Sequence, residues 1–196
     1  LKDILIKRAS LPIHRFFLVW IVRIEILKGK QIIDSGLAEQ VIEFDKHNMQ
    51  SVLETAGIAF PEEKRRRDLQ SNPTFIIAFE NGAIAGYIEY LRSWRDPNFI
   101  YVGSLQIAEK HRHTCLILKL LDEFKSAVSD EDFVGFETNV QKTNLPAVKI
   151  YQKLGFKLQE NPNNQASWLA TAEKDLLETS PIAPLVERWR EKSRTA

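Results

Sequence analysis

Residues 144–156 constrain the fold of this chain more than any other stretch of its sequence. They read N-L-P-A-V-K-I-Y-Q-K-L-G-F, and the spacing of a helix runs through Asn144, Ala147, Ile150, Tyr151 and Leu154. Gly155 follows this periodic segment, where glycine commonly ends a helix because it adopts positive φ without a Cβ clash. Phe156 then begins an apolar run typical of a strand. The segment therefore predicts a short helix between two strands.

The rest of the chain alternates between strand-like and helix-like patterns. Apolar runs rich in β-branched and aromatic residues predict strands at residues 19–27, 74–79, 83–91, 99–107, 132–140, 156–159 and 167–174. Apolar residues at helical spacing, with their capping residues, predict helices at residues 37–44, 49–56, 61–69, 116–128 and 185–193. Gly29 predicts a turn, and Asn81-Gly82 predicts a two-residue hairpin. This order indicates an α+β domain with one mixed, largely antiparallel sheet.

Composition and charge argue against nucleic-acid and membrane proteins. The 196 residues are 44% hydrophobic and 27% charged, and the net charge is +1, so no global field favours an anionic partner. The apolar run at residues 16–27 is too short to span a bilayer and contains Arg23 and Glu25. The chain begins at Leu1 and its single methionine is Met49, so we expect its natural start to be missing.

Cysteine and histidine are too sparse to build a disulfide framework or a metal centre. Cys115 is the only cysteine, which fits a reducing compartment, and we expect a cytoplasmic protein. His111 and His113 are two residues apart, but no second cluster completes a metal site. We therefore expect no metal.

The segment at residues 144–156 resembles the last core motif of the GNAT superfamily of N-acetyltransferases. The motif N-x-x-A-x-x-[I/L]-Y-x-K-x-G-F is matched at Asn144, Ala147, Ile150, Tyr151, Lys153, Gly155 and Phe156. The resemblance covers roughly residues 19–175 and implies a GNAT-like acyl-CoA N-acyltransferase fold, with helices on both faces of the sheet. We expect an N-terminal extension at 1–18, the acetyltransferase domain at 19–176, and a C-terminal tail with a short helix at 177–196.

The same resemblance implies where the donor, acetyl-CoA, binds. The motif helix would lie beside the pantetheine arm, and the residue at the position of Tyr151 would protonate the departing thiolate. Without the motif, Tyr151 is simply a half-buried aromatic whose hydroxyl finds a partner. The family binds the pyrophosphate with a loop of the form [Q/R]-x-x-G-x-[G/A], through free N–H groups at a helix N-terminus. Arg112 fits this loop, whereas Cys115 and Ile117 replace its small residues. Either the backbone still holds the pyrophosphate, or Ile117 blocks its approach.

The donor is therefore expected to contact the end of the fourth strand, the loop and the motif helix. The resemblance places the thioester carbonyl against backbone N–H groups between Leu105 and Ile107. Asn139 and Asn144 either bind the pantetheine amides or serve only as helix caps. The complete set of expected donor contacts is Leu105, Gln106, Ile107, Arg112, His113, Thr114, Cys115, Leu116, Ile117, Asn139, Asn144, Ala147 and Tyr151.

A general base is the other requirement of acetyl transfer, because the attacking ammonium must lose a proton. The resemblance implies a glutamate on the fourth strand, but Gly103 occupies that position. Glu89 and Glu137 lie in apolar stretches, where burial tunes a carboxylate towards a useful base, and they are the available substitutes. Each is alternatively an outward-facing strand residue. Deprotonation through water, without a dedicated base, is a further alternative.

The basic run from Lys64 to Arg67 is the one local concentration of positive charge before the second strand. Acidic residues flank it, so the pattern favours a solvated helix face over a nucleic-acid site. If the segment borders the acceptor pocket, its basic rim favours an acidic acceptor.

Together these features predict an acetyl-CoA-dependent N-acetyltransferase in which a primary amine attacks the thioester directly. The main alternative is a protein of the same shape that has lost catalysis and acts as a binding or scaffold module. A third possibility keeps acyl-CoA binding but uses a longer acyl chain or an acceptor other than an amine. The expected partners are acetyl-CoA and an amine acceptor, without nucleic acid or membrane. The apolar first strand and the C-terminal helix leave a homodimer open.

Overall fold

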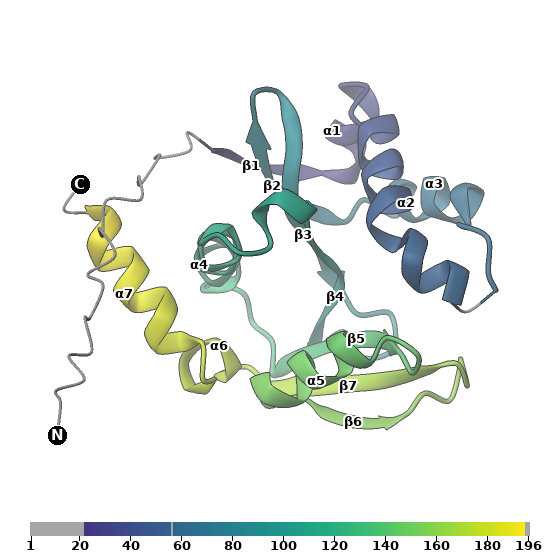
Figure 1. Cartoon of the computed structure of the whole chain (residues 1–196). Helices are drawn as coiled ribbons and strands as arrows, with labels where there is room; N and C mark the ends of the chain where they lie inside the picture. The colour runs from purple at the N-terminus through teal and green to yellow at the C-terminus, as the bar shows by residue number, and fades with distance from the viewer. Residues whose placement is uncertain (1–21, 56, 195–196) are drawn as a thin grey trace, which may run out of the picture.

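Among the residues that the computed structural model describes, 22–55 and 57–194, seven strands form one sheet (Figure 1). In chain order they are β1 (Arg23–Lys28), β2 (Thr74–Glu80), β3 (Ala83–Arg92), β4 (Phe99–Ile107), β5 (Gly135–Gln141), β6 (Lys157–Glu160) and β7 (Ser167–Glu173). Across the sheet the order is β1-β2-β3-β4-β5-β7-β6, and all neighbours are antiparallel except β4 and β5. The expected mixed, largely antiparallel sheet is confirmed.

Helices cover both faces of this sheet, as the resemblance implied. One face carries α1 (Gly29–Asp34), α2 (Ala38–Thr55) and α3 (Glu62–Gln70). The other carries α4 (Leu116–Val128), α5 (Leu145–Leu154) and α6 (Leu176–Thr179). The short 3-10 helix η1 (Glu109–His111) precedes α4, and α7 (Ala183–Arg194) follows α6. No helix in the described part of the chain is both long and apolar enough to cross a membrane.

Alternation along the strands divides the apolar core into two clusters. Phe75, Ile77 and Tyr87 pack with α1, α2 and α3, whereas Ile76 and Ile88 pack with α4 and α5. Successive side chains of a strand point to opposite faces, so β2 and β3 each supply both clusters. Asn81 and Gly82 make the predicted two-residue hairpin between β2 and β3, and both have positive φ, 51° and 82°.

The first helical region differs from the expectation in two ways. Gly29 begins α1 instead of forming a turn. A Cβ at Gly29 would lie 2.3 Å from the carbonyl oxygen of Leu69, so this glycine permits α1 to pack closely against the end of α3. The two helices expected at 37–44 and 49–56 are one helix, α2. It continues through the polar residues 45–48 because Asp45 is buried in an ion pair with Arg65. Residues 19–21 of the first expected strand lie outside the described residues.

The chain beyond β7 extends the core rather than leaving it. Leu176, Ala183 and Val186 are buried, and α7 lies alongside α4 (Figure 1). Arg190 of α7 forms an ion pair with Asp122 of α4. The helix expected at residues 185–193 is confirmed as α7, while α6 and η1 were not predicted because each is only one turn long.

Candidate active site

The parallel strands β4 and β5 touch at one end only. They pair from Phe99 with Gly135 to Tyr101 with Glu137, and beyond this point β4 pairs with β3 alone and β5 with β7 alone. The edge of β4 that faces β5 therefore has no strand partner in residues 102–107. Unpaired backbone groups on such an edge can bond an extended ligand as an added strand would. We call this wedge between the two strands the opening.

A β-bulge at Gly103 marks the place where the two strands separate. Glu89 of β3 lies opposite Ser104, and the next residue of β3 lies opposite Val102, so Gly103 has no residue opposite it. The bulge also shifts the alternation of side chains along β4. As a result, Val102 and Leu105 both face the α4–α6 side. Bulges commonly occur beside active sites because they re-aim side chains.

Helix α5 carries the predicted tyrosine, and motif residues define both of its ends. The Oδ1 atom of Asn144 accepts a 3.2 Å hydrogen bond from the N–H of Ala147, so Asn144 is an N-cap. Gly155 ends the helix with φ of 98°, as predicted. The prediction of the apolar face was wrong for Ile150, which is 54% exposed. The residues that pack on the core are Ala147, Val148, Tyr151 and Leu154.

Tyr151 reaches from α5 to the start of the opening. Its ring packs edge-to-face against Phe156, with the ring centroids 5.0 Å apart. Burial raises the pKa of Tyr151, and a hydrogen bond with Thr138 acts in the opposite direction. Thr138 directly follows Glu137, the last β5 residue that pairs with β4. The phenol of Tyr151 is therefore neutral at physiological pH and lies where the strands separate.

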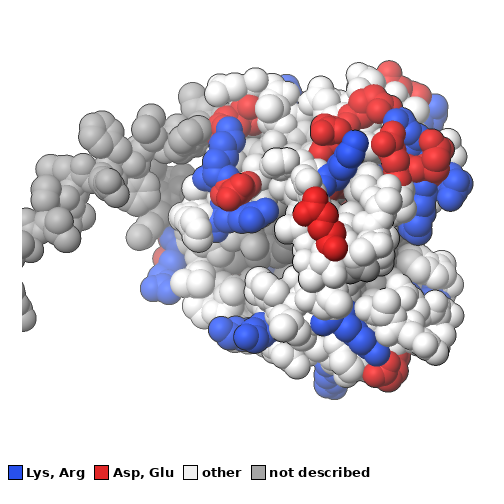
Figure 2. All heavy atoms as spheres, turned by 45° about the vertical axis from the view of Figure 1, so that its right-hand side comes forward, with Lys and Arg blue, Asp and Glu red and all other residues white. Residues whose placement is uncertain are grey.

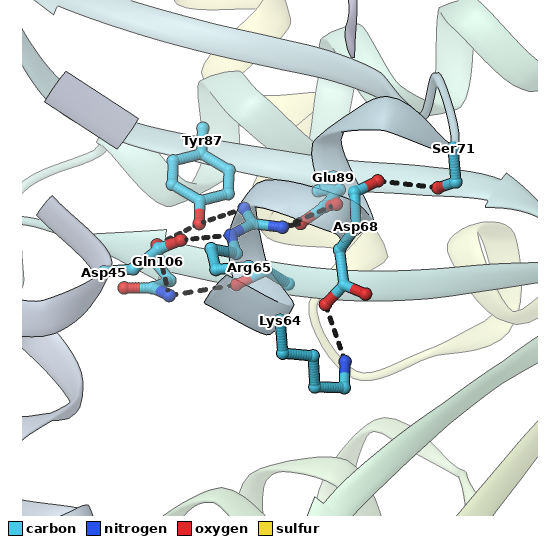
Figure 3. A network of polar contacts seen from close by, with 9 residues as sticks. Asp45, Lys64, Arg65, Asp68, Ser71, Tyr87, Glu89 and Gln106 are labelled. Carbon is cyan, nitrogen blue, oxygen red and sulfur yellow. Dashed lines mark hydrogen bonds and ion pairs between the residues drawn. The ribbon is translucent and has the colours of Figure 1, made fainter. Parts of the chain in front are cut away.

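On the α1–α3 side of the sheet, one arginine joins two buried acids (Figure 3). Arg65 donates from Nε to Asp45 at 2.6 Å and from Nη1 to Glu89 at 2.9 Å. The Tyr87 hydroxyl donates to Asp45 and accepts a 3.2 Å bond from Arg65. Gln106 of β4 also donates to Asp45, at 2.8 Å. The expectation of a solvated helix face was wrong for Arg65, whose side chain is only 11% exposed.

Two carboxylates share a single guanidinium in this network. Burial raises the pKa of Asp45, and the positive charge of Arg65 opposes that shift. Burial also raises the pKa of Glu89, again against the charge of Arg65. Burial likewise raises the pKa of Tyr87, which stays a neutral phenol. A raised carboxyl pKa is the property that a general base needs near neutral pH.

Glu89 occupies the space that a side chain at Gly103 would enter. A Cβ at Gly103 would lie 3.4 Å from Cδ of Glu89 and 3.5 Å from the ring of Tyr101. A carboxylate of the neighbouring strand thus lies beside the β4 position where the family resemblance implies one. The outward-facing alternative is wrong for Glu89, which is 5% exposed.

A second polar cluster lies beside the last pair of β4 and β5. Glu137 accepts hydrogen bonds from Ser93 and, at 2.9 Å, from Arg95. Arg95 also donates to Asn139 at 3.0 Å, and Asn139 donates to the Tyr101 hydroxyl at 3.2 Å. Burial raises the pKa of Tyr101 to about 12. The outward-facing alternative is wrong for Glu137 too, but its carboxylate is engaged with the β3–β4 loop.

The N-terminus of α4 follows the open end of β4 and offers free backbone donors. The N–H of Leu116 bonds the Thr114 hydroxyl at 3.2 Å. Within the described residues, the N–H groups of Cys115, Ile117 and Leu118 make no hydrogen bond to the chain. Cys115 has φ of −77°, a conformation that needs no glycine, and its side chain is exposed. The replaced glycines therefore leave the helix N-terminus able to bind an anion such as a pyrophosphate.

The residues expected to contact the donor do not all meet at one point. Arg112, His113 and Thr114 are exposed before α4, while Leu116 is buried in the core and Ile117 is half-buried. Leu105 and Ile107 face the α4–α6 side, and Gln106 faces the acidic network. Asn139 belongs to the cluster around Glu137. The structure thus brings Leu105 and Tyr151 together across one cavity and assigns Gln106 and Asn139 to the other side.

Figure 2 shows a hollow near the middle of the face that is turned towards the viewer, with both signs of charge around it. The basic run on α3 is largely paired: Arg66 bonds Glu39 and Glu62, and Lys64 bonds Asp68 at 2.6 Å. A purely basic rim, which would favour an acidic acceptor, is therefore not what this face presents. No group of three or more His, Cys, Asp or Glu among the described residues is arranged to hold a metal ion.

Asp45, Arg65 and Tyr101 belong to the polar side of the site, and sequence reasoning missed all three. A signal for Asp45 was present, because it lies four residues after Val41 and three after Ile42, on the apolar face of α2. Arg65 carries no such signal, since it stands among like residues and its partners are distant in sequence.

Sequence and structure comparisons agree with this geometry. A model of the acetyltransferase (GNAT) family matches residues 40–156. The fold is shared with the PaiA N-acetyltransferase from Thermoplasma acidophilum in complex with coenzyme A, at a TM-score of 0.57 and 18% identity over 78% of this chain and 98% of that one. An acetyltransferase from Thermus thermophilus gives a TM-score of 0.58 at 18% identity, over 78% and 96% of the two chains. A GNAT acetyltransferase from Staphylococcus aureus gives 0.58 at 18%, over 77% and 99%. No curated protein sequence matches the chain.

A mixed sheet that opens between its two parallel strands, with free N–H groups at the start of the following helix, suits the binding of an acyl-CoA donor. The family match spans more than half of the sequence. This chain therefore belongs to the GNAT acetyltransferase family and is an N-acetyltransferase with acetyl-CoA as its donor.

Proposed function

We propose that this protein transfers an acetyl group from acetyl-CoA to a primary amine at the opening between β4 and β5. The observation that carries the proposal is the half-buried, neutral Tyr151 beside Thr138, where the two strands separate. A protonated phenol at that point can supply the proton that the departing thiolate needs. The exact acceptor stays open among small amines, amino acids and protein amines.

The donor side of the proposal rests on backbone groups. Acetyl-CoA supplies an activated acyl group as a thioester and a pyrophosphate as a handle. The free N–H groups of Cys115, Ile117 and Leu118 suit the pyrophosphate. The unpaired edge of β4 around Leu105 to Ile107 suits the pantetheine amides and the thioester carbonyl.

We assign the general base to Glu89. Its carboxylate lies against Gly103 at the bulge, and burial raises its pKa. In this scheme the acceptor ammonium gives a proton to Glu89, directly or through a water. The amine nitrogen then forms the C–N bond to the thioester carbon, the C–S bond breaks, and Tyr151 gives its proton to the sulfur. The acylated nitrogen loses its second proton, which restores the phenol of Tyr151 through solvent, and the product is a neutral amide. Glu137 is the second candidate, but the nearest neighbours of Gly103 include Glu89 and not Glu137, whose carboxylate accepts from Arg95 and Ser93.

The acceptor side is polar, and the side chain of Gln106 there has a buried oxygen without a partner in the described part of the chain. Oε1 of Gln106 makes no hydrogen bond to the described residues, although its Nε2 bonds Asp45 and Ser104. Buried polar atoms are rarely left unpaired. An amine or hydroxyl of the acceptor would satisfy this oxygen.

Isothermal titration calorimetry with acetyl-CoA, followed by an acceptor screen that detects released thiol, tests the proposal. The exposed Cys115 would react with thiol reagents, so the screen should use Cys115→Ser with a no-amine blank. We expect acetyl-CoA to bind and at least one amine class to release CoA. No binding at millimolar acetyl-CoA would refute the enzyme and favour a scaffold protein, whereas binding without release from any amine would redirect the search to other acceptors.

Two further assignments are proposals of the same kind. A cytoplasmic location fits an acetyl-CoA-dependent enzyme with an exposed thiol. A homodimer finds less support, because α7 already packs along α4 of its own chain. Sedimentation velocity on the purified protein would decide the oligomeric state.

A further inference from the structure

An apolar cavity lies on the α4–α6 side of the sheet, and transfer of an acetyl group does not require it. Its volume is about 50 Å³, and its walls include Leu121, Phe124, Phe136, Leu154 and Phe156. A cavity needs only about 10–15 Å³ of such volume to hold one water. Protein interiors rarely contain voids of this size, and apolar ones stay dry and accept apolar ligands. There is room here for several carbon-sized groups.

The cavity adjoins the atoms that react in the proposed transfer. Tyr151 is part of its wall, as are Val102 and Leu105, the β4 residues on either side of the bulge. A thioester whose sulfur lies beside Tyr151 would place its carbonyl carbon next to this space. The substituent on that carbon is the acyl chain, so the cavity is within reach of any carbons beyond the acetyl methyl.

The outer wall of the cavity comes from the C-terminal part of the chain. Leu176, Leu177 and Ile182 line it, and all lie beyond residue 156, where the family match ends. Their position is held by α7, through buried Val186 and the Arg190–Asp122 ion pair. The space is therefore built jointly by the family core and by an extension outside the matched region.

We propose that this cavity binds the alkyl chain of donors longer than acetyl-CoA, and that the enzyme accepts short linear acyl-CoA thioesters such as propionyl-CoA and butyryl-CoA. This inference rests on the proposed function, because it needs the thioester beside Tyr151. The reaction is unchanged: the C–N bond forms, the C–S bond breaks, and the whole acyl group moves to the amine. The two extra carbons of a butyryl group match the several carbon-sized groups that the cavity can hold.

Calorimetry of acetyl-CoA, butyryl-CoA and CoA binding to the full chain provides the test, and it requires no acceptor. Each buried methylene adds about 0.8 kcal/mol, so butyryl-CoA should bind roughly tenfold more tightly than acetyl-CoA. Equal affinities would overturn the inference while leaving the proposed function standing. If acetyl-CoA itself does not bind, the proposed function fails, and the inference fails with it.

Two substitutions at Ile182 test whether the acyl chain binds in this cavity, and one substitution at Leu185 is their control. Ile182→Phe fills the space and should abolish the tenfold preference while acetyl-CoA affinity stays within about twofold. Ile182→Ala enlarges it and should move the preference towards hexanoyl-CoA, so a failure of the Phe variant to fold does not end the test. Leu185→Phe makes a similar change at a position that is 42% exposed and outside the cavity, and should alter nothing. If both Ile182 variants keep an unchanged preference for butyryl-CoA, the butyryl chain binds outside this cavity.

Discussion

The α1–α3 side of the sheet and the α4–α6 side meet the opening with opposite chemistry. On the first side, Asp45, Arg65 and Glu89 form a buried charged network, and Glu89 lies against the bulge at Gly103. On the second, the proposed proton donor Tyr151 lies in an apolar wall. Amine activation needs a charged base, whereas thiolate protonation needs a neutral acid, and each chemistry has the surroundings that maintain it. The sheet separates the two environments, and they meet at the opening.

Removing the shared cation should disturb the polar side most. Arg65→Met leaves Asp45 and Glu89 buried without a counter-charge, and we expect a loss of about 3–5 kcal/mol in the free energy of unfolding at pH 7. Both carboxyl pKa values are already raised by burial and would rise further. The loss should therefore shrink as the pH falls and the acids become neutral. Urea unfolding at pH 8 and pH 5 measures both effects.

Lys64→Met is the matched control for that change. Lys64 pairs with Asp68 at 2.6 Å on the exposed side of the same helix. Exposed pairs contribute little, so the expected change is within about 1 kcal/mol and nearly independent of pH. Equal losses in the two variants would contradict the view that the Arg65 network is a distinct buried site.

Removing the proposed acid, Tyr151, should lower the rate of catalysis rather than the stability of the fold. Tyr151→Phe keeps the ring against Phe156 but has no proton to give, so we expect kcat to fall roughly 10²–10³-fold. Acetyl-CoA affinity should stay within about twofold. Steady-state kinetics with the best amine from the screen measures this. Tyr90→Phe removes another phenol hydroxyl on the same side and should leave kcat nearly unchanged. A wild-type rate in Tyr151→Phe would mean that Tyr151 is not the acid.

Glu89→Gln and Asp45→Asn separate a base from a structural acid within one network. Both remove a partner of Arg65, so both should lower stability. Only Glu89 contacts the bulge, and its loss should lower kcat/KM about 10–10²-fold at pH 7. Because burial raises the pKa of Glu89, wild-type kcat/KM should climb with pH at values above the ordinary 4.5. The Asn variant should keep this limb of the pH profile and the Gln variant should lose it. The same loss in both variants would assign Glu89 a structural role.

The smallest expected effect concerns the support of Tyr151. Asn144→Ala removes the N-cap bond to Ala147 and should cost about 1 kcal/mol of stability. In a domain of this size that corresponds to a fall in Tm of about 2–4 °C, measurable by thermal denaturation. Thr143→Ala, one residue earlier and exposed, should change Tm very little. Unchanged Tm in Asn144→Ala would mean that the cap does not stabilise α5.

Much of the fold followed from the sequence because its signals are local. The helix from Leu116 to Val128 was predicted at both ends, and the hairpin at Asn81-Gly82 and the end of α5 at Gly155 depend on backbone preferences of single residues. The prediction of a turn at Gly29 was wrong because this glycine permits a close approach to Leu69, which is 40 residues away in the sequence. The sequence predicted which segments form strands, but it did not predict that β4 and β5 separate after Tyr101.

The candidate site was only half readable, since its acidic side depends on contacts between distant segments. Tyr151 lies within a motif, and it was predicted from that motif. The pairing of Arg65 with Asp45 and Glu89 joins α3, α2 and β3, and no spacing along the chain encodes it. The contact of Glu89 from β3 with Gly103 of β4 also depends on positions in space. The sequence also did not predict that Leu177 and Ile182 line the cavity, because this wall depends on contacts between distant segments.

A crystal structure of the protein with acetyl-CoA tests most directly whether the base and the acid lie on opposite sides of the opening. We predict that the thioester sulfur lies within hydrogen-bond reach of the Tyr151 hydroxyl, with the carbonyl oxygen on the unpaired edge of β4. Glu89 should then face the thioester from the opposite side, with room for an amine between them. A donor bound outside the opening, or a sulfur remote from Tyr151, would contradict the account.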